Sequence, residues 1–206
     1  MPMTVSQQYS LGFPRAAIET RSPEVIRQQF PRRALLPNKK DGLWQIESGV
    51  VRTLTWLEDG TIITLGLWGP GEMVGKMLSG CNPYQIECLG KVEANFIPKA
   101  ECEHFEDVLL KHILQGEELT MIRANKKVDT MLYQLLNWLA KKFGCHVEKG
   151  QLINLSLTHQ DIAELLGATR VTITRILNQL EQQGIIHRLK LHRIVLHDSE
   201  FWHYEI

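Results

Sequence analysis

The 206-residue sequence predicts an α+β protein with an antiparallel β module first, a long helix next, and a helix-turn-helix with a terminal hairpin last. Three observations lead to this fold class. Short apolar runs broken by glycine fill residues 35–98, and a proline-free amphipathic stretch fills residues 105–143. Two short helices with capping residues then follow within residues 158–184.

Composition indicates a globular protein and sets limits on its surroundings. Hydrophobic residues make up 44% of the chain, and no apolar run approaches the ~20 residues that a membrane-spanning helix needs. The first residues lack the basic region and apolar stretch of a secretion signal. The four cysteines, Cys81, Cys88, Cys102 and Cys145, form no C-x-x-C pair. We therefore expect a cytoplasmic protein with reduced thiols and no membrane partner.

Charge alone gives no case for a nucleic-acid partner, because 23 basic and 23 acidic side chains leave a net charge of zero. Such a case must come from a local motif. No catalytic signature of a hydrolase, phosphate-binding loop or dinucleotide-binding enzyme is present, so the chain is not expected to be an enzyme. His187, His192 and His197 lie five residues apart and fit no zinc spacing, so no metal is expected either.

The β module is predicted from its turns. Asp59-Gly60 separates the apolar runs 53–57 and 61–65, a strong signal for a β-hairpin. Gly69-Pro70-Gly71 marks a further tight turn. Antiparallel strands spaced this evenly usually close into a barrel or a sandwich.

The long helix carries an apolar seam. Positions that alternate in steps of four and three from residue 110 to residue 138 are all apolar except Glu117. Such a seam fits a helix that pairs with a second copy, but also a helix that lies on its own β module. The polar segment 125–127 interrupts the pattern, and we place there the joint between two domains, 1–127 and 128–206. The candidate dimer residues are Leu110, Leu114, Met121, Ala124 and Val128.

The helix-turn-helix is predicted from its caps and its apolar positions. Thr158 and Asp161 form a capping box, Gly167 permits a sharp turn, and Thr169 caps a second helix over residues 170–183. On that second helix, apolar side chains recur at helical spacing and fix an inward face. This inward face consists of Ile173, Ile176, Leu177 and Leu180.

The opposite face of the second helix suits base edges in a DNA major groove, where each good bidentate contact discriminates by about 1 to 3 kcal/mol. The candidate base contacts are Arg170, Val171, Thr174, Arg175 and Asn178. Hydroxyls, amides and cations near helix starts and on a winged hairpin after Gly184 suit phosphates. The candidate phosphate contacts are Thr158, His159, Gln160, Thr169, Thr172, His187, Arg188 and Lys190. A helical hairpin used for protein contacts would show the same spacing.

Residues 157–177, LTHQDIAELLGATRVTITRIL, resemble the helix-turn-helix of the cyclic-AMP receptor protein/FNR family. Residues 43–51 and 68–75 resemble the β-roll of the same family, so the similarity extends over residues 32–196. The resemblance implies a cupin-like, effector-sensing β-roll, a long dimerisation helix and a C-terminal winged helix-turn-helix. It also implies a homodimer that regulates transcription on pseudo-palindromic duplex DNA, with RNA polymerase as a partner.

Two departures from the family pattern refine these expectations. Members that bind cyclic AMP have glutamate where this chain has Lys76, and residues 80–85 contain no arginine for the cyclic phosphate. We therefore expect no cyclic-AMP binding and no cofactor. Gly75, Lys76 and Tyr84 are candidates for a pocket that takes another effector, although the sequence favours a solvated Lys76 over one that contacts an anion.

The recognition helix begins Arg170-Val171-Thr172, which is similar to the nitrogen-control branch of the family in cyanobacteria. Most members of the family have glutamate where this chain has Val171. Valine lacks the acceptor for cytosine N4 that glutamate offers, but its side chain can contact a thymine methyl group. The resemblance implies GTA and TAC half-sites.

Three alternative interpretations of the same fold can be compared with this one. Iron-sulfur members ligate their cluster through N-terminal cysteines, and residues 1–80 contain none. A redox or haem sensor on the same fold would draw its ligands from Cys81, Cys102, His104 and His112. A protein-interaction module would keep the winged helix without binding DNA, and the missing excess of basic residues favours that reading.

Overall fold

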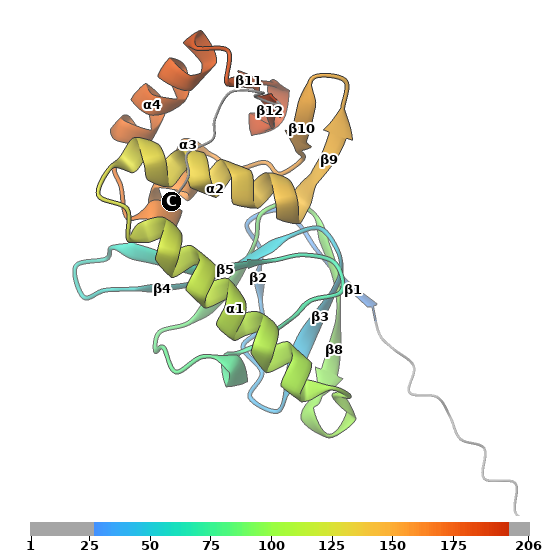
Figure 1. The fold of residues 1–206 in the computed structure, drawn as a ribbon. Helices are drawn as coiled ribbons and strands as arrows, with labels where there is room; N and C mark the ends of the chain where they lie inside the picture. The colour runs from blue at the N-terminus through green and yellow to red at the C-terminus, as the bar shows by residue number, and fades with distance from the viewer. Residues whose placement is uncertain (1–26, 198–206) are drawn as a thin grey trace, which may run out of the picture.

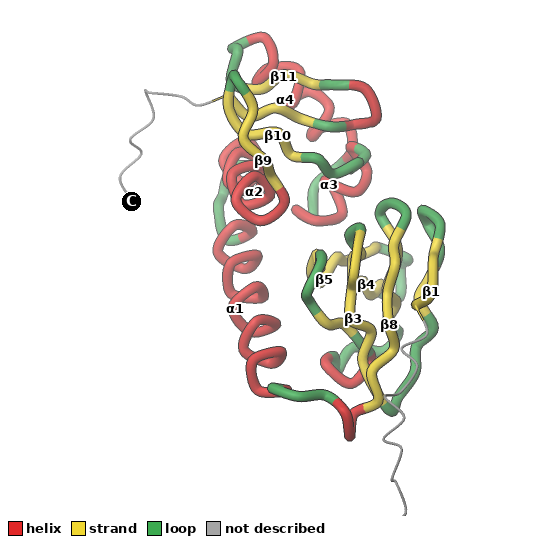
Figure 2. The backbone as a smooth tube through the Cα atoms, turned by 90° about the vertical axis from the view of Figure 1, so that its right-hand side faces the viewer, coloured by secondary structure: helices red, strands yellow, loops and turns green. Residues whose placement is uncertain are grey.

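The computed structural model describes residues 27–197. It contains an N-terminal β-roll, a long helix α1 (Phe105–Arg123) along one side of the roll, and a C-terminal domain that follows α1 (Figures 1 and 2). The predicted α+β class and order of parts are therefore confirmed. Within the described residues, no helix has the length and apolar character needed to cross a membrane.

Two four-stranded antiparallel sheets form the roll, in the orders β1-β8-β3-β6 and β2-β7-β4-β5. Their side chains meet in one core around Trp44, which contacts Phe30 and Phe96 edge to face. The first strand precedes residue 35, where the sequence pattern placed the start of the β module, and it pairs with the last strand of the roll. The strands are β1 (Arg27–Phe30), β2 (Leu35–Leu36), β3 (Gly42–Ser48), β4 (Val51–Trp56), β5 (Ile62–Trp68), β6 (Met73–Val74), β7 (Gln85–Cys88) and β8 (Val92–Pro98), with short 3-10 turns at Lys76–Leu78 and Lys99–Glu101.

Glycine serves two different purposes in the turns of the roll. Gly60 lies at the tip of the predicted β4–β5 hairpin with φ 83°, and Gly49 lies between β3 and β4 with φ 81°. Among the described atoms beyond its own neighbours, a Cβ at Gly60 would meet nothing within 4 Å. A Cβ at Gly49 would lie 2.2 Å from the carbonyl oxygen of Lys91.

We expect Gly49→Ala to lower the free energy of unfolding by about 1 to 2 kcal/mol more than Gly60→Ala does. Both substitutions force alanine into a left-handed backbone conformation, but only the first adds a collision with backbone. Urea denaturation of the two variants measures the difference. Equal losses of stability would show that the turn at Gly49 relaxes without cost.

Helix α1 ends where the polar segment was predicted to interrupt the helical pattern. Helix α2 (Val128–Phe143) starts after four intervening residues and runs in a different direction (Figure 1). The apolar seam does not run on as one surface, which corrects the expectation of a seam from residue 110 to residue 138. Met131, Leu135 and Trp138 are buried in the core of their own chain.

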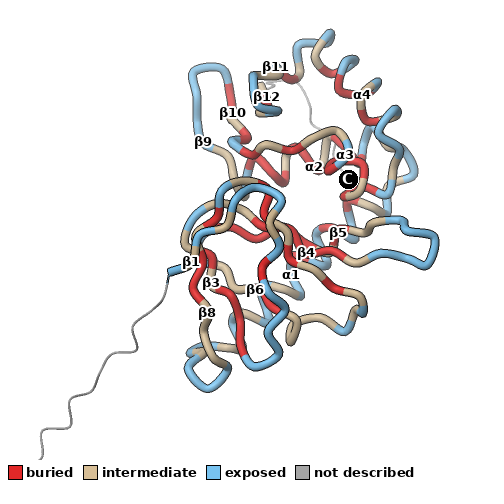
Figure 3. Tube along the Cα trace, turned by 180° about the vertical axis from the view of Figure 1, so that it is seen from behind, coloured by how far each residue is buried: buried red, intermediate tan, exposed pale blue. Residues whose placement is uncertain are grey.

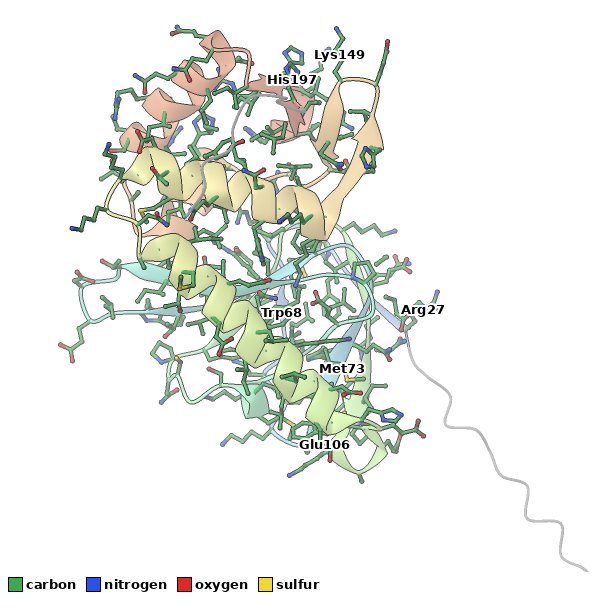
Figure 4. All side chains as sticks on the ribbon, viewed as in Figure 1. Arg27, Trp68, Met73, Glu106, Lys149 and His197 are labelled. Atoms are coloured by element: carbon green, nitrogen blue, oxygen red, sulfur yellow. The ribbon has the colours of Figure 1, made fainter. Side chains whose placement is uncertain are left out.

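Polar contacts fix α1 against the roll. The His112 ring stacks on Trp68 with centroids 3.7 Å apart, and its Nε2 lies 2.8 Å from the Met73 carbonyl oxygen. The amide oxygen of Gln115 accepts a hydrogen bond from the Leu67 backbone N–H at 2.7 Å. Trp68 and Met73, both labelled in Figure 4, lie along the course of α1.

The C-terminal domain combines three helices with one antiparallel sheet of order β11-β12-β10-β9. The terminal hairpin β11–β12 was predicted, whereas the hairpin β9–β10 was not. Gly150, with φ 137°, lets the chain reverse between these two strands. The elements after α2 are β9 (Gly144–Val147), β10 (Gly150–Ile153), α3 (His159–Leu166), α4 (Arg170–Gln182), β11 (Ile186–Arg188), a 3-10 turn at Lys190–His192 and β12 (Ile194–His197).

A continuous apolar core joins the C-terminal domain to the rest of the chain. It includes Leu67 and Leu89 of the roll, Leu119 and Ile122 of α1, and the inward faces of α2, α3 and α4. The predicted division at residues 127 and 128 stays a prediction, since this core extends across it.

Candidate nucleic-acid interface

The helix-turn-helix is built by local hydrogen bonds that the sequence specifies. The Asp161 backbone N–H donates to Thr158 Oγ1 at 3.1 Å, and the Thr158 backbone N–H donates to Asp161 Oδ2 at 2.8 Å. This is the predicted capping box of α3. Gly167 ends α3 in the left-handed region, with φ 66°, and the hydroxyl of Thr169 accepts from the Thr172 backbone N–H at the start of α4. Both caps hold the turn in one geometry.

Helix α4 presents its two faces as predicted. Ile173, Ile176, Leu177 and Leu180 are buried, whereas the Val171 side chain on the opposite face is 79% exposed. Arg170, Arg175 and Asn178 are also exposed, and α4 lies on the side of the C-terminal domain away from the roll (Figure 3). The Arg175 guanidinium donates to Gln179 Oε1 at 3.1 Å, a contact between exposed side chains that leaves its remaining donors directed outward.

Thr174 differs from the other candidate base contacts because it is half-buried and already hydrogen-bonded. Its Oγ1 donates to the Arg170 carbonyl oxygen at 2.8 Å and lies 2.8 Å from Nδ1 of His159. Its hydroxyl therefore ties α4 to the start of α3. A contact between Thr174 and base edges stays a prediction. Because the hydroxyl is already hydrogen-bonded, the methyl group is the part of the side chain that would contact a base.

The candidate phosphate contacts fall into two groups. Thr158, Gln160, Thr169 and Thr172 lie at the starts of α3 and α4, where the Thr169 and Thr172 hydroxyls bond each other at 2.9 Å. His187 and Lys190 are exposed on the terminal hairpin, which we call the wing (residues 186–197). Arg188, also on the wing, forms an ion pair with Glu181, so part of its charge is compensated.

A half-open pocket lies between the helix-turn-helix and the wing. Its volume is about 250 Å³, and its lining comes from α3, α4 and the wing. The polar lining is entirely basic: His159, Arg188, His192 and Arg193. Burial lowers the pKa of His159 below its ordinary value, and the positive charges of Arg188, His192 and Arg170 lower that pKa further.

A largely buried cluster of charges, which the sequence did not predict, joins the roll to the helix-turn-helix. We call it the interdomain ion cluster; it consists of Arg33, Arg52 and Glu87 from the roll and Asp161 and Glu164 from α3. Two nitrogens of Arg33 each donate to one oxygen of Asp161 at 2.9 Å. Arg52 lies 2.5 Å from Glu87 and 2.6 Å from Glu164, and its side chain is 6% exposed.

The cluster favours the ionised form of Asp161. Burial alone would raise the pKa of Asp161, but hydrogen bonds from Arg33 and Thr158 and the charge of Arg52 leave that pKa below its usual range. The hydrogen bond with Asp161 raises the pKa of Arg33 in turn. One carboxylate thus caps α3 and also attaches α3 to the roll.

The candidate effector residues lie at one end of the roll. Lys76 is half-buried, its ammonium donates to the carbonyl oxygens of Ser79 and Cys81, and it lies 5.6 Å from the centroid of the Tyr84 ring. The expectation of a solvated Lys76 is therefore wrong, because its ammonium satisfies backbone carbonyls of the following loop. Tyr84 is buried, and Gly75 packs against Leu43. Whether these residues take an effector stays a prediction.

The candidate dimer residues on α1 form an exposed apolar face. Leu110 and Leu114 are about half exposed and Met121 is 71% exposed, while Leu109 and Ile113 extend the same face. Ala124 is exposed just beyond the end of α1, but Val128 packs against the core of its own chain. The sequence argument missed Leu109 and Ile113, although they lie one residue before Leu110 and Leu114.

The candidate haem ligands are spread over different contacts. His112 is committed to the Trp68 ring and the Met73 carbonyl described above, and burial lowers its pKa. Cys102 Sγ lies 3.7 Å from the sulfur of Met73. Cys81 is half-buried beside Lys76, and His104 is exposed before α1 with φ 53°. All four cysteines of the chain are free thiols.

The β-roll, the long helix and the exposed second helix of a capped helix-turn-helix define a winged-helix transcription regulator. A Crp-like helix-turn-helix domain matches residues 131–200. The regulatory protein CysR of Synechococcus elongatus is 41% identical over 170 residues, which is 81% of this chain and 82% of that protein. The chain belongs to the CRP/FNR family of transcription regulators.

Two further proteins are similar to this chain, the second of them in its fold. The global nitrogen regulator of a Nostoc species is 38% identical over 85 residues, 40% of this chain and 38% of that protein. The crystal structure of a CRP-family transcriptional regulator from Thermus thermophilus superimposes with a TM-score of 0.70 at 21% identity, over 83% of this chain and 92% of that one. The relatives are named as regulators rather than enzymes, as the sequence predicted.

Proposed function

We propose that the protein binds pseudo-palindromic duplex DNA as a homodimer and places its two α4 helices in successive major grooves, about 34 to 36 Å apart. The observation that carries this proposal is the exposed face of α4, where Arg170, Val171 and Arg175 project from a helix capped at its start and buried along its other side. The proposal includes RNA polymerase as a partner in the cytoplasm.

The half-sites we propose are of the GTA/TAC type. An arginine donates two hydrogen bonds to guanine O6 and N7, and an apolar side chain contacts the thymine methyl group. Arg175 or Arg170 would read the guanine and Val171 the neighbouring thymine. Similarity to a global nitrogen regulator, 38% identical over 85 residues, supports this preference.

Selection from random duplex DNA tests the function and the half-site together. We expect enrichment of two GTA-type half-sites in inverted repeat, and an affinity that falls linearly with salt on logarithmic axes as displaced counterions are released. Enrichment of TGTGA-type half-sites would contradict the proposed reading. Absence of any preferred sequence at low salt would contradict the function itself.

The homodimer is proposed to form through the exposed apolar face of α1. This face contains Leu110, Leu114 and Met121, side chains that monomeric proteins seldom expose together. A second copy of α1 would cover it, which is one of the two arrangements that the apolar spacing predicts.

We expect Met121→Glu to raise the dissociation constant of the dimer about thirtyfold, because it removes apolar burial and opposes two carboxylates across the two-fold axis. Sedimentation equilibrium measures the change. Leu57→Glu is the matched control, since Leu57 is 51% exposed in the β4–β5 turn, outside the proposed interface. An unchanged dimer in the Met121 variant would place the interface elsewhere.

Cyclic AMP is not proposed as the effector. Lys76 occupies the position where cyclic-AMP binders carry glutamate, and its ammonium is bonded to the loop that would have to supply the phosphate contact. Calorimetric titration with cyclic AMP is expected to give no binding heat at millimolar concentrations. An effector of another kind near Gly75, Lys76 and Tyr84 remains part of the proposal, with its identity open.

A further inference from the structure

Two kinds of side chain, apolar and basic, line the pocket between the helix-turn-helix and the wing. Leu157, Ile162, Leu177 and Ile194 form apolar walls, while the polar atoms come from His159, Arg188, His192 and Arg193. The start of α3 and the wing therefore bring four basic side chains to one pocket.

No carboxylate lines this pocket within residues 27–197, and the charged groups around His159 are mostly basic. On its own helix, Asp161 and Glu164 are engaged by Arg33 and Arg52 of the interdomain ion cluster. From α4 it faces Arg170, and from the wing it faces Arg188 and His192. Glu181 compensates Arg188 alone.

Hydrogen bonding assigns the two nitrogens of the His159 ring. The hydroxyl proton of Thr174 is donated to the Arg170 carbonyl oxygen, so Thr174 Oγ1 can only accept from His159. The neutral imidazole therefore carries its proton on Nδ1. Nε2 keeps a lone pair and is the atom that gains a proton from solvent.

We infer that this pocket is a proton-linked phosphate site, in which an oxyanion held by His159, His192 and Arg193 is bound together with a proton on His159 Nε2. The ligand is a phosphate group, supplied either by the backbone of bound DNA or by free inorganic phosphate. The inference deepens the proposed function and rests on it where DNA supplies the phosphate, because the pocket borders α4 and the wing.

The sign of the linkage follows from the charges. Without an anion, burial and neighbouring cations disfavour the imidazolium form and hold the pKa of His159 below its ordinary value. A bound phosphate reverses that balance and raises the pKa, so binding takes up a proton between the two pKa values. Affinity is then greatest below the lower pKa, declines as the pH rises from the lower pKa to the higher one, and is constant above it.

The test measures the affinity of the full chain for its selected duplex from about pH 5.5 to about pH 8 at constant ionic strength. Calorimetry in buffers of different ionisation enthalpy counts the protons taken up. We expect up to about one proton per protomer, which is at most about a tenfold loss of affinity per pH unit for each protomer. His159→Gln should flatten this dependence while keeping a side chain that donates to Thr174.

Two variants give the test its controls. His146→Gln changes an exposed histidine on β9 whose ring contacts Gln151, outside the pocket, and should keep the full pH dependence. His192→Gln should weaken binding but leave a proton uptake that persists at His159. If His192→Gln abolishes the uptake and His159→Gln does not, the assignment to His159 is overturned.

A second arm separates the two sources of phosphate. Inorganic phosphate replaces chloride at equal ionic strength, and the His159 ring is followed by NMR in the DNA-free protein. A raised midpoint of titration with phosphate identifies a site for free oxyanions, and a midpoint raised only by duplex identifies the DNA backbone. No change with either probe overturns the inference. A wild-type protein that binds its duplex with no pH dependence also overturns it, whereas failure to bind duplex at any pH contradicts the proposed function instead.

Discussion

Replacing Arg175 by alanine should reduce the affinity for a selected duplex by about two to four orders of magnitude and remove its sequence preference. A bidentate contact from arginine to guanine is worth about 1 to 3 kcal/mol, and the two-fold symmetry of a dimer applies the loss twice. Binding titrations by fluorescence anisotropy, on selected and on scrambled duplexes, measure both effects.

The fold should tolerate this change. Arg175 is exposed on α4, and its recorded side-chain contact is the one with Gln179. We therefore expect unchanged circular dichroism and an unchanged dimer. Lys91→Ala is a matched control, because it removes one exposed positive charge from the roll and should leave sequence preference intact. Unfolding of the Arg175 variant would show that the residue does not face outward, and retained preference would show that other residues read the site.

Replacing Arg52 by methionine should lower the free energy of unfolding by about 3 to 5 kcal/mol. Arg52 is nearly fully buried, and its removal leaves Glu87, Asp161 and Glu164 with the more exposed Arg33 as their remaining cation in the cluster. Methionine keeps the length and the apolar stem of the side chain, so the loss reports mainly on uncompensated charge. Guanidinium denaturation followed by tryptophan fluorescence measures the change.

Arg27→Met is the matched control for this experiment. Arg27, labelled in Figure 4, lies 3.9 Å from Glu93 at the edge of the roll, and its side chain is 61% exposed. Solvent screens such a pair, so its loss should cost about 0 to 1 kcal/mol. Similar losses in the two variants would mean that the interdomain ion cluster contributes nothing beyond an ordinary surface ion pair.

The interdomain ion cluster should also make the free energy of unfolding depend on pH in the acidic range. Because the pKa of Asp161 is lower in the folded chain than in the unfolded chain, its contribution is fully present above the unfolded pKa. It is lost as the pH falls through the lower, folded-state pKa.

The helix-turn-helix could be predicted in detail because its determinants are close together in sequence. Thr158 and Asp161 lie three residues apart, Gly167 ends the helix that they start, and each cap acts within one turn. The apolar spacing of α4 then determines its exposed face without reference to the rest of the fold. The β4–β5 hairpin could be predicted for the same reason, since Asp59-Gly60 specifies its turn.

The interdomain ion cluster could not be predicted from the sequence. Arg33 is 128 positions from Asp161, and Arg52 is 112 positions from Glu164, so no local pattern joins them. The hairpin β9–β10 was missed because its strands are short and β9 is largely exposed, which gives little apolar alternation. The apolar seam was predicted to extend over both helices because the same spacing of apolar residues occurs on an exposed face of α1 and on a buried face of α2.

Asp161 takes part both in the start of α3 and in the attachment of the DNA-binding domain to the roll. Any event that separates Arg33 from α3 also removes two hydrogen bonds from Asp161, the carboxylate that caps α3. Loosened docking and a frayed motif would then arise together. A signal that reaches the roll would thus change the internal structure of the helix-turn-helix as well as its orientation.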